Sequence, residues 1–272
     1  MKKLLVLGWM ILVLMGRLQA CSIVYYIDSA TGKIYVANNE DYFLNVKPYI
    51  RIEPAGQNSY ARLWYGWKDF AQGGINAEGL FFDGATTPDE PEVPGYHKPK
   101  GNLGDEILAQ CKNVEEAVAY LEKKKVALTN GHLMFGDKYG HAVVVEWVDK
   151  EQKIISIKNG LLLAINFLLT DTGKGGYPCP RYSAMEAEAI RLKESSDSVG
   201  LKQVGNIAAR AVQVPAKDAK GKDVGTLYST FIDISDMKFK LVYKLDNRNI
   251  TSLDLKQEFA NNKGRTIELH GQ

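Results

Sequence analysis

The stretch Ala20-Cys21-Ser22-Ile23-Val24-Tyr25-Tyr26-Ile27 constrains this chain more than any other part of it. An apolar leader ends at Ala20, and a run of β-branched and aromatic residues typical of a strand follows Cys21 directly. Cleavage after Ala20 would make Cys21 the first residue of the mature chain. Its thiol and a free α-amine would then belong to one residue, so a nucleophile would come with its own base.

Residues 1–20 have the pattern of a secretory signal peptide. Lys2 and Lys3 form a positively charged start, residues 4–15 form an apolar core, and Leu18-Gln19-Ala20 ends in a small residue. The apolar run is too short for a comfortable membrane span. We therefore assign 1–20 to a signal peptide and 21–272 to a single domain, and we expect an exported protein, periplasmic or extracellular.

Charge and residue spacing exclude several classes of function. The formal charge of +2 falls to −1 without the three basic residues of 1–20, so no basic patch favours nucleic acid. The four histidines and three cysteines match no metal-binding motif, and we expect no metal and no cofactor. A papain-like pairing of cysteine with His132 or His141 stays open. Cys111 and Cys179 are either a disulfide or two buried thiols.

Strands dominate the first third of the mature chain. Residue type and alternation predict strands over 33–38, 49–53, 59–65 and 79–83, besides the one that begins after Cys21. The polar turn at 28–32 predicts that the first two strands form a hairpin. Residues 85–101 contain four prolines, which is typical of either a lid or binding loop or an irregular surface loop.

Helices and strands then follow one another in blocks. Apolar periodicity predicts helices over 102–111, 113–125, 182–193 and 201–212, with Asn113 as an N-cap. Strands are predicted over 132–135, 141–148, 153–157 and 161–166, and a last hairpin joins 226–235 to 238–244. This order predicts an α+β fold with two stacked sheets between helix layers, not a βαβ repeat.

Several short segments occur in a characteristic order. They are Cys21-Ser22-Ile23-Val24, Ala37-Asn38-Asn39-Glu40-Asp41-Tyr42, Gly74-Ile75-Asn76-Ala77-Glu78-Gly79-Leu80, Phe135-Gly136-Asp137 with Val145-Glu146-Trp147, Ile165-Asn166-Phe167 and Pro180-Arg181-Tyr182. In order and spacing the chain resembles the N-terminal-nucleophile (Ntn) hydrolases of linear amides, which include choloylglycine hydrolases, penicillin V acylases and isopenicillin N acyltransferases. The resemblance covers nearly all of the mature chain and implies a four-layer αββα sandwich of two antiparallel sheets as one catalytic domain.

The resemblance implies a role for four polar side chains. Cys21 is the expected nucleophile, and its α-amine would accept the thiol proton and pass it to the leaving amine. Asp41 is expected to hold that amine by a charge-assisted hydrogen bond. Asn166 is expected to donate its amide to the oxyanion. Arg181 is expected near the nucleophile, where it would lower the thiol pKa and orient Asp41 or substrate.

Two more positions are assigned to oxyanion or substrate binding. Thr86 lies near the expected second oxyanion donor, a backbone N–H, and Asn39 lies in the segment that returns beside Cys21. One departure from the family pattern is Asn38, which stands where an arginine is usual. The missing positive charge would have favoured the thiolate or an anionic substrate group, so bile-salt or penicillin specificity is not carried over.

The expected function is hydrolysis of a linear amide through an acyl-thioester on Cys21. The substrate is expected to be a small N-acyl amide of bile-salt, penicillin or N-acyl amino acid type, and transfer to an acceptor amine would use the same intermediate. Aromatic residues predict an apolar acyl pocket, or else core packing: Tyr65, Trp67, Phe70 and Tyr96. A homo-oligomer is left open.

A second class of function stays open at the same cysteine. Leu18-Gln19-Ala20-Cys21 is an acceptable lipobox, and acylation of its sulfur would make a lipid-anchored, non-catalytic surface binding protein. A tethered domain needs a flexible spacer after its lipid, whereas an apolar strand starts here two residues after the cysteine. We expect no stable membrane insertion unless Cys21 is lipidated. A third interpretation makes Cys21 merely a small residue near the cleavage site.

Overall fold

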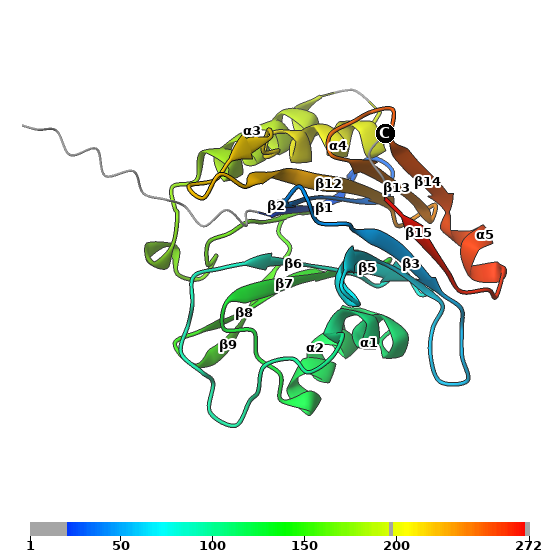
Figure 1. The fold of residues 1–272 in the computed structure, drawn as a ribbon, viewed down its shortest axis with the longest axis horizontal. Helices are drawn as coiled ribbons and strands as arrows, with labels where there is room; N and C mark the ends of the chain where they lie inside the picture. Colours follow the sequence, from blue (N-terminus) through cyan, green and yellow to red (C-terminus); the bar gives the residue numbers. More distant parts are fainter. Residues whose placement is uncertain (1–20, 196–197, 270–272) are drawn as a thin grey trace, which may run out of the picture.

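The structure is a computed structural model that describes residues 21–195 and 198–269. The expected signal peptide, 1–20, therefore lies outside the described residues. Two antiparallel sheets face each other and are covered on their outer faces by helices (Figure 1). The predicted α+β class and the four-layer αββα sandwich are confirmed.

The first sheet places the strand that follows Cys21 in its interior. Its order is β10-β1-β2-β12-β13-β14, with β11 beside β12. The strands are β1 (Ser22–Ile27), β2 (Ile34–Phe43), β10 (Leu161–Ala164), β11 (Ala216–Lys217), β12 (Asp223–Asp233), β13 (Lys238–Tyr243) and β14 (Ile250–Asp254). The predicted hairpin is present, since β1 pairs with β2 from Ser22 opposite Asn39 to Ile27 opposite Ile34.

The second sheet is built largely from consecutive hairpins. Its order is β15-β3-β4-β5-β6-β7-β8-β9, so the last strand of the chain joins the edge beside β3. The strands are β3 (Tyr49–Glu53), β4 (Arg62–Trp67), β5 (Phe70–Asn76), β6 (Phe81–Thr86), β7 (Gly131–Gly136), β8 (Ala142–Val148), β9 (Glu151–Ser156) and β15 (Arg265–Glu268).

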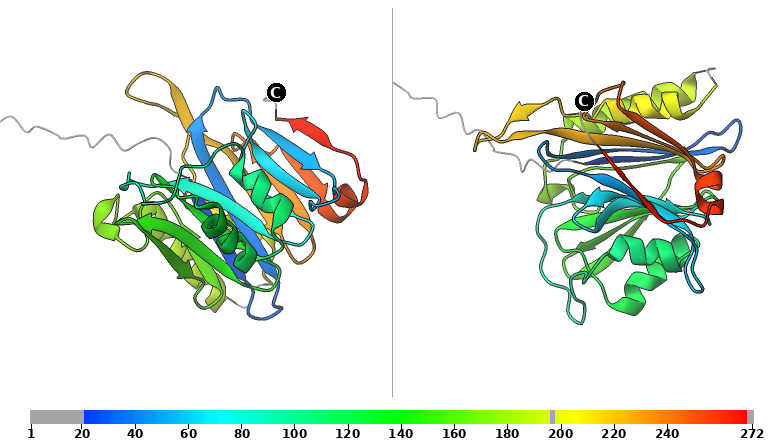
Figure 2. Two further views of the ribbon diagram at one scale, coloured as in Figure 1. Left: turned by 90° about the horizontal axis from the view of Figure 1, so that it is seen from below. Right: turned by 45° about the vertical axis from the view of Figure 1, so that its right-hand side comes forward.

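The helices form the two outer layers. Helices α1 (Leu103–Gln110) and α2 (Val114–Lys124) cover the second sheet, and α3 (Pro180–Glu194) and α4 (Leu201–Ala209) cover the first (Figure 2). A 3₁₀ turn (Thr172–Lys174) precedes α3, and the short α5 (Leu255–Ala260) links β14 to β15. Asn113 caps α2 as predicted, because its side chain accepts from the Glu116 N–H. Among the described residues, no helix is long and apolar enough to span a membrane.

Side-chain alternation along each strand creates three apolar layers. In β1, Ile23 and Tyr25 point into the core between the sheets, whereas Val24 and Tyr26 pack under α3 and α4. All four side chains are at most 2% exposed. A strand that is covered on both faces has apolar residues at consecutive positions, which is why β1 has no polar face.

Four strands were not predicted: β5, β11, β14 and β15. Strand β5 was missed because Gly73 and Gly74 interrupt its apolar pattern. These glycines allow close packing: a Cβ at Gly73 would overlap the Asp83 carboxyl group and Tyr65, and one at Gly74 would overlap the Leu63 carbonyl. The segments β14 to α5 and β15 were also missed, because their mixed polar sequence carries little periodicity.

The two remaining cysteines are not joined in this structure. Cys111 is a buried free thiol at the end of α1, and Cys179 is a half-buried one before α3, in the opposite helix layer. The proline-rich segment 87–102 is irregular, and the Thr87 and Glu90 N–H groups bond to Asn130 and Thr129. This loop is therefore held against the strand that begins at Gly131.

Asn76 gives a direct test of how the β5–β6 turn is held. Its buried amide donates to the Leu108 and Cys111 carbonyls at 2.8 and 2.7 Å, and its oxygen accepts from the N–H groups of Glu78 and Leu80. Asn76→Ala should lower the free energy of unfolding by about 3 kcal/mol, because buried carbonyls lose their donors. Urea unfolding measures this, and the exposed Asn58→Ala is the control. Equal stability of both variants would contradict it.

Candidate active site

Cys21 lies at the start of β1, where two neighbouring strands surround it. Its side chain is 5% exposed, and its Sγ lies 3.4 Å from Oε1 of Glu40 on β2. Ser22, the next residue, pairs with Asn39, which brings the Asn39 to Asp41 part of β2 beside the thiol. The predicted nucleophile and the predicted Asp41 are thus adjacent, although 20 residues separate them in the sequence.

Asp41 is a fully buried carboxyl with two partners. It accepts from Thr226 Oγ1 at 2.5 Å, at a bulge in β12, and forms an ion pair with Arg181 Nη1 at 3.2 Å. Burial raises the pKa of Asp41 to about 7, and the bonds from Thr226 and Arg181 limit that rise. A carboxyl with a pKa near neutral pH can exchange a proton with a neighbouring amine.

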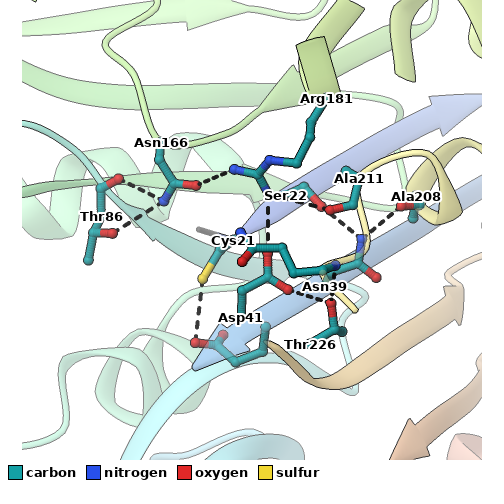
Figure 3. Close-up of polar contacts among 12 residues, drawn as sticks. Cys21, Ser22, Asn39, Asp41, Thr86, Asn166, Arg181, Ala208, Ala211 and Thr226 are labelled. Carbon is teal, nitrogen blue, oxygen red and sulfur yellow. Dashed lines mark hydrogen bonds and ion pairs between the residues drawn. The ribbon is translucent and has the colours of Figure 1, made fainter. Parts of the chain in front are cut away.

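Asn166 and Thr86 form the other side of the site. Asn166 lies just after β10, and its Nδ2 donates to the Thr86 carbonyl at 3.0 Å and to Thr86 Oγ1 at 3.2 Å. Figure 3 draws Cys21 between this pair and Asp41, with Arg181 above them. Arg181 joins the two sides, since its Nη2 donates to Asn166 Oδ1 at 3.4 Å.

The thiol of Cys21 has a raised pKa, and Arg181 lies close to the acid beside it. Burial raises the pKa of Cys21 well above its usual value, and Glu40 and Asp41 raise it further, while the Asp41 backbone N–H opposes them. The Arg181 guanidinium bonds to Asp41, Asn166 and the Ala211 carbonyl. The ion pair places Arg181 where it could orient Asp41, and its effect on the thiol pKa stays a prediction.

Asn39 lies away from the thiol on the opposite face of β2. Its Nδ2 donates to Ser22 Oγ and to the Ala208 carbonyl, and its Oδ1 accepts from Ser229 Oγ. The side chain is 1% exposed and joins the sheet to α4. The structure therefore does not bring Asn39 to the cavity described next, and its amide is already occupied by three partners.

A cavity of about 290 Å³ opens beside Cys21. It lies where the second sheet divides. Strands β5 and β6 pair with each other only over Gly73–Ile75 and Phe81–Asp83, and their remaining residues pair only with the outer neighbours β4 and β7. The cavity is lined by residues from both sides of this division, including Trp67, Phe70 and Thr86. Of the predicted pocket aromatics, Trp67 and Phe70 line it, whereas Tyr65 and Tyr96 do not. Pro99 brings the proline-rich loop to its wall.

Glu40 is a residue of the site that the sequence analysis missed. Its side chain is 3% exposed and lines the cavity next to the thiol. It belongs to a buried group of acids, because Asp83 raises its pKa in addition to burial. Alternation along β2 was the available signal: Val36 belongs to the core between the sheets, so Glu40, four residues on, faces the same way.

His132 and Glu146 form a second buried pair at the cavity. His132 Nδ1 lies 2.9 Å from Glu146 Oε1, and His132 lines the cavity while Glu146 accepts from the Leu169 and Thr170 N–H groups. The pair thus holds the loop that follows Asn166. Within residues 21–195 and 198–269 the Cys21 thiol bonds to Glu40 and to no histidine, which disfavours the papain-like alternative. No group of three His, Cys, Asp or Glu residues that could hold a metal occurs in the described chain.

The two facing sheets between helix layers form an αββα sandwich that is similar to several solved structures. A variant of conjugated bile acid hydrolase from Clostridium perfringens is similar, with a TM-score of 0.73 and 17% identity over 91% of this chain and 97% of that one. Penicillin V acylase from Agrobacterium tumefaciens gives 0.70 and 19%, covering 92% and 91%. A Caenorhabditis elegans N-acylethanolamine-hydrolyzing acid amidase ortholog gives 0.55 and 14%, covering 79% and 93%.

These likenesses confirm at the level of fold the resemblance that the sequence motifs predicted. No protein-family model matches the sequence, and no curated protein matches it. The identities of 14–19% establish the architecture. The activity has to be argued from the residues of the site.

The buried acids predict an unusual dependence of stability on pH. Burial raises the pKa of Asp83 from 3.8 to about 8, so the folded state binds this proton more tightly than the unfolded chain. Its contribution to stability is therefore largest at low pH and is lost as pH rises from about 4 to about 8. Asp83→Asn removes this titrating group. Between pH 5 and 8 the free energy of unfolding of the variant should therefore fall less than that of wild type, by at least about 1.4 kcal/mol.

Urea unfolding at several pH values measures the difference. Glu92→Gln, which changes an exposed carboxyl in the proline-rich loop, is the surface control. Parallel pH profiles for wild type and Asp83→Asn would contradict the expected proton uptake on folding.

Proposed function

We propose that this protein is an exported amidase that hydrolyses a linear C–N amide bond, with Cys21 as an N-terminal nucleophile. The observation that carries the proposal is the bonded chain Thr226–Asp41–Arg181–Asn166 around a buried cysteine that faces a cavity. The fold supports it, since the similar structures are named as a hydrolase, an acylase and an amidase.

The reaction begins with removal of the leader. Cleavage after Ala20 frees the α-amine of Cys21, which is the base that the thiol needs because its pKa is raised. The amine takes the thiol proton, and the buried Asp41 carboxylate holds the resulting ammonium. Arg181 keeps Asp41 in place through their ion pair.

Acyl transfer then follows through a thioester. The Cys21 sulfur attacks the amide carbonyl carbon, and the C–N bond breaks as the ammonium returns its proton to the leaving amine. Water then attacks the thioester, which releases the carboxylic acid and restores the thiol. An acceptor amine in place of water would give acyl transfer from the same intermediate.

The oxyanion is stabilised by donors on the Thr86 side of the thiol. Asn166 Nδ2 donates to two oxygens of Thr86 in the described structure, so its N–H groups already point into this region. The carbonyl oxygen of the substrate replaces one of these acceptors as its charge develops. A backbone N–H near Thr86, at the end of β6, supplies the second donor.

The burial of Cys21 favours the amidase over the lipid-anchored alternative. The residue is 5% exposed, and the β1 strand that follows it is hydrogen-bonded on both edges, to β2 and to β10. A diacylglyceryl group on its sulfur would have to leave the sandwich beside β2. A free thiol that faces a cavity is instead what a nucleophile requires.

Cys21→Ala tests the proposal. The mature variant should lose hydrolysis of a panel of N-acyl amides, because no other group forms the acyl intermediate. Cys179→Ser, which removes a half-buried thiol, is the matched control and should keep the activity. N-terminal sequencing and intact mass show whether the chain begins at an unmodified Cys21. A lipid-sized mass on Cys21, or full activity of Cys21→Ala, would contradict the mechanism.

Asn166→Ala tests the oxyanion assignment. The loss of one oxyanion donor should lower kcat about 100- to 1,000-fold, with a smaller change in KM, because the bond strengthens in the transition state. Steady-state kinetics on an amide that wild type hydrolyses measure this, with the exposed Asn261→Ala as control. An unchanged kcat would remove Asn166 from the oxyanion site.

A further inference from the structure

Glu40 is a buried carboxyl beside the nucleophile that the proposed reaction does not use. Its Oε1 accepts from the Cys21 thiol at 3.4 Å. Its Oε2 is buried and has no hydrogen-bond partner among residues 21–195 and 198–269. Since the side chain lines the cavity, this oxygen is a hydrogen-bond acceptor available to a ligand.

The side chains around Glu40 are mostly acidic. Burial, Asp83 and Asp41 raise the pKa of Glu40. Tyr228 is paired with Glu40 on the neighbouring strand, and burial, Glu40 and Asp83 raise its pKa. In the described part of the chain, no lysine or arginine lowers the pKa of Glu40 or Asp83. Asn38, which shares this face of β2, adds no charge. A positively charged ligand group would supply the missing partner.

His132 places a second unpartnered polar atom in the same cavity. Glu146 accepts three bonds from Leu169 and Thr170, so it is a carboxylate and His132 Nδ1 donates its proton to it. The Nε2 atom on the other side of the His132 ring carries no such bond. It is fully buried, and no described residue donates to it. Glu40 Oε2 and His132 Nε2 are therefore both available to a ligand in the cavity.

The remaining wall of the cavity is mostly apolar. Trp67, Phe70, Phe82, Leu103 and Leu128 line it. A ligand that fits must therefore combine an apolar body with at least one hydrogen-bond donor.

The contact between Glu40 and the thiol limits where that donor lies. In a reactive complex the carbonyl carbon is about 3–3.5 Å from the attacking sulfur. Glu40 Oε1 is itself 3.4 Å from this sulfur. A group on the carbon next to the carbonyl, or one carbon further, is therefore within reach of the carboxyl, whereas a group at the far end of a long chain is not.

We propose that Glu40 binds a protonated amine on the α- or β-carbon of the acyl group, so that the preferred substrates are amides of amino-substituted acids with an apolar side chain. This inference rests on the proposed amidase function and names its substrate class. The amine pairs with the free oxygen of Glu40, and the apolar side chain enters the division between β5 and β6. Glu40 is thus a specificity residue. Because Asn38 is uncharged, it does not neutralise the Glu40 carboxylate, which can pair with the substrate.

Charged thiol reagents test the binding claim without any need for hydrolysis. The reagents are 2-aminoethyl and 2-sulfonatoethyl methanethiosulfonate. The rate at which each reagent modifies Cys21 is divided by the rate at which the same reagent reacts with free 2-mercaptoethanol. Peptide mass mapping separates modification of Cys21 from that of Cys111 and Cys179. We expect wild type to favour the cationic reagent about tenfold. Glu40→Gln, which keeps the shape, should bring the ratio near one, and Glu92→Gln should not. Any change in thiol reactivity affects both reagents alike and cancels.

A matched substrate series tests the class of acyl group. Three amides share one leaving amine and carry 2-amino-3-phenylpropanoyl, 2-hydroxy-3-phenylpropanoyl or 3-phenylpropanoyl groups. The amino compound should have about tenfold higher kcat/KM than the other two, and Glu40→Gln should lower that value alone. Equal rates for the amino and hydroxy compounds would contradict recognition of a cation.

The two experiments separate the possible failures. If no amide in the series or in the wider panel is hydrolysed but the reagent ratio follows Glu40, the proposed amidase function fails and the cation site stands. If wild type and Glu40→Gln give the same reagent ratio, the inference is overturned whether or not amides are hydrolysed. Thermal melting checks that Glu40→Gln is folded. If that variant is unstable, the reagent ratio of wild type alone decides the inference.

Discussion

The antiparallel pairing of β1 with both β2 and β10 is the contact on which the candidate site depends. Pairing with β2 places Cys21 beside Glu40 and Asp41, and pairing with β10 brings Asn166, just beyond that strand, to the same end of the sheet. Arg181, at the start of α3, then ties Asp41 to Asn166. Groups from four separate segments thus meet at one thiol because a single strand is held on both edges.

Alternation along β2 gives its carboxyls two different environments. Asp41 has an arginine and a threonine as partners, whereas Glu40, its neighbour, points to the other side with the thiol as its one hydrogen-bond partner among the described residues. Burying an acid without a cation costs free energy, which the fold must recover elsewhere. Such a cost is typical of functional sites, and it is the physical reason to assign Asp41 to the nucleophile and Glu40 to the substrate.

Sequence alone predicted the features that depend on local pattern. The β1–β2 hairpin, the Asn113 cap and the sandwich followed from alternation, turn chemistry and the order of elements, and the family motifs selected Cys21, Asp41, Asn166 and Arg181. The strand β5 was not predictable because its glycines have a tertiary cause, the approach of Tyr65 and Asp83. Glu40 and Asn39 differ only in which face of β2 they occupy, and that is decided by packing against the second sheet and α4.

The central claim is that the mature chain begins at Cys21 and carries the acyl group on that sulfur. The most direct measurement is the mass of the N-terminal peptide after the exported protein reacts with an excess of a hydrolysable amide and is quenched in acid. The account predicts a peptide that begins at Cys21 and is heavier by one acyl group, lost on treatment with hydroxylamine. A peptide that begins elsewhere, or one that never gains the acyl mass while the amide is consumed, would contradict it.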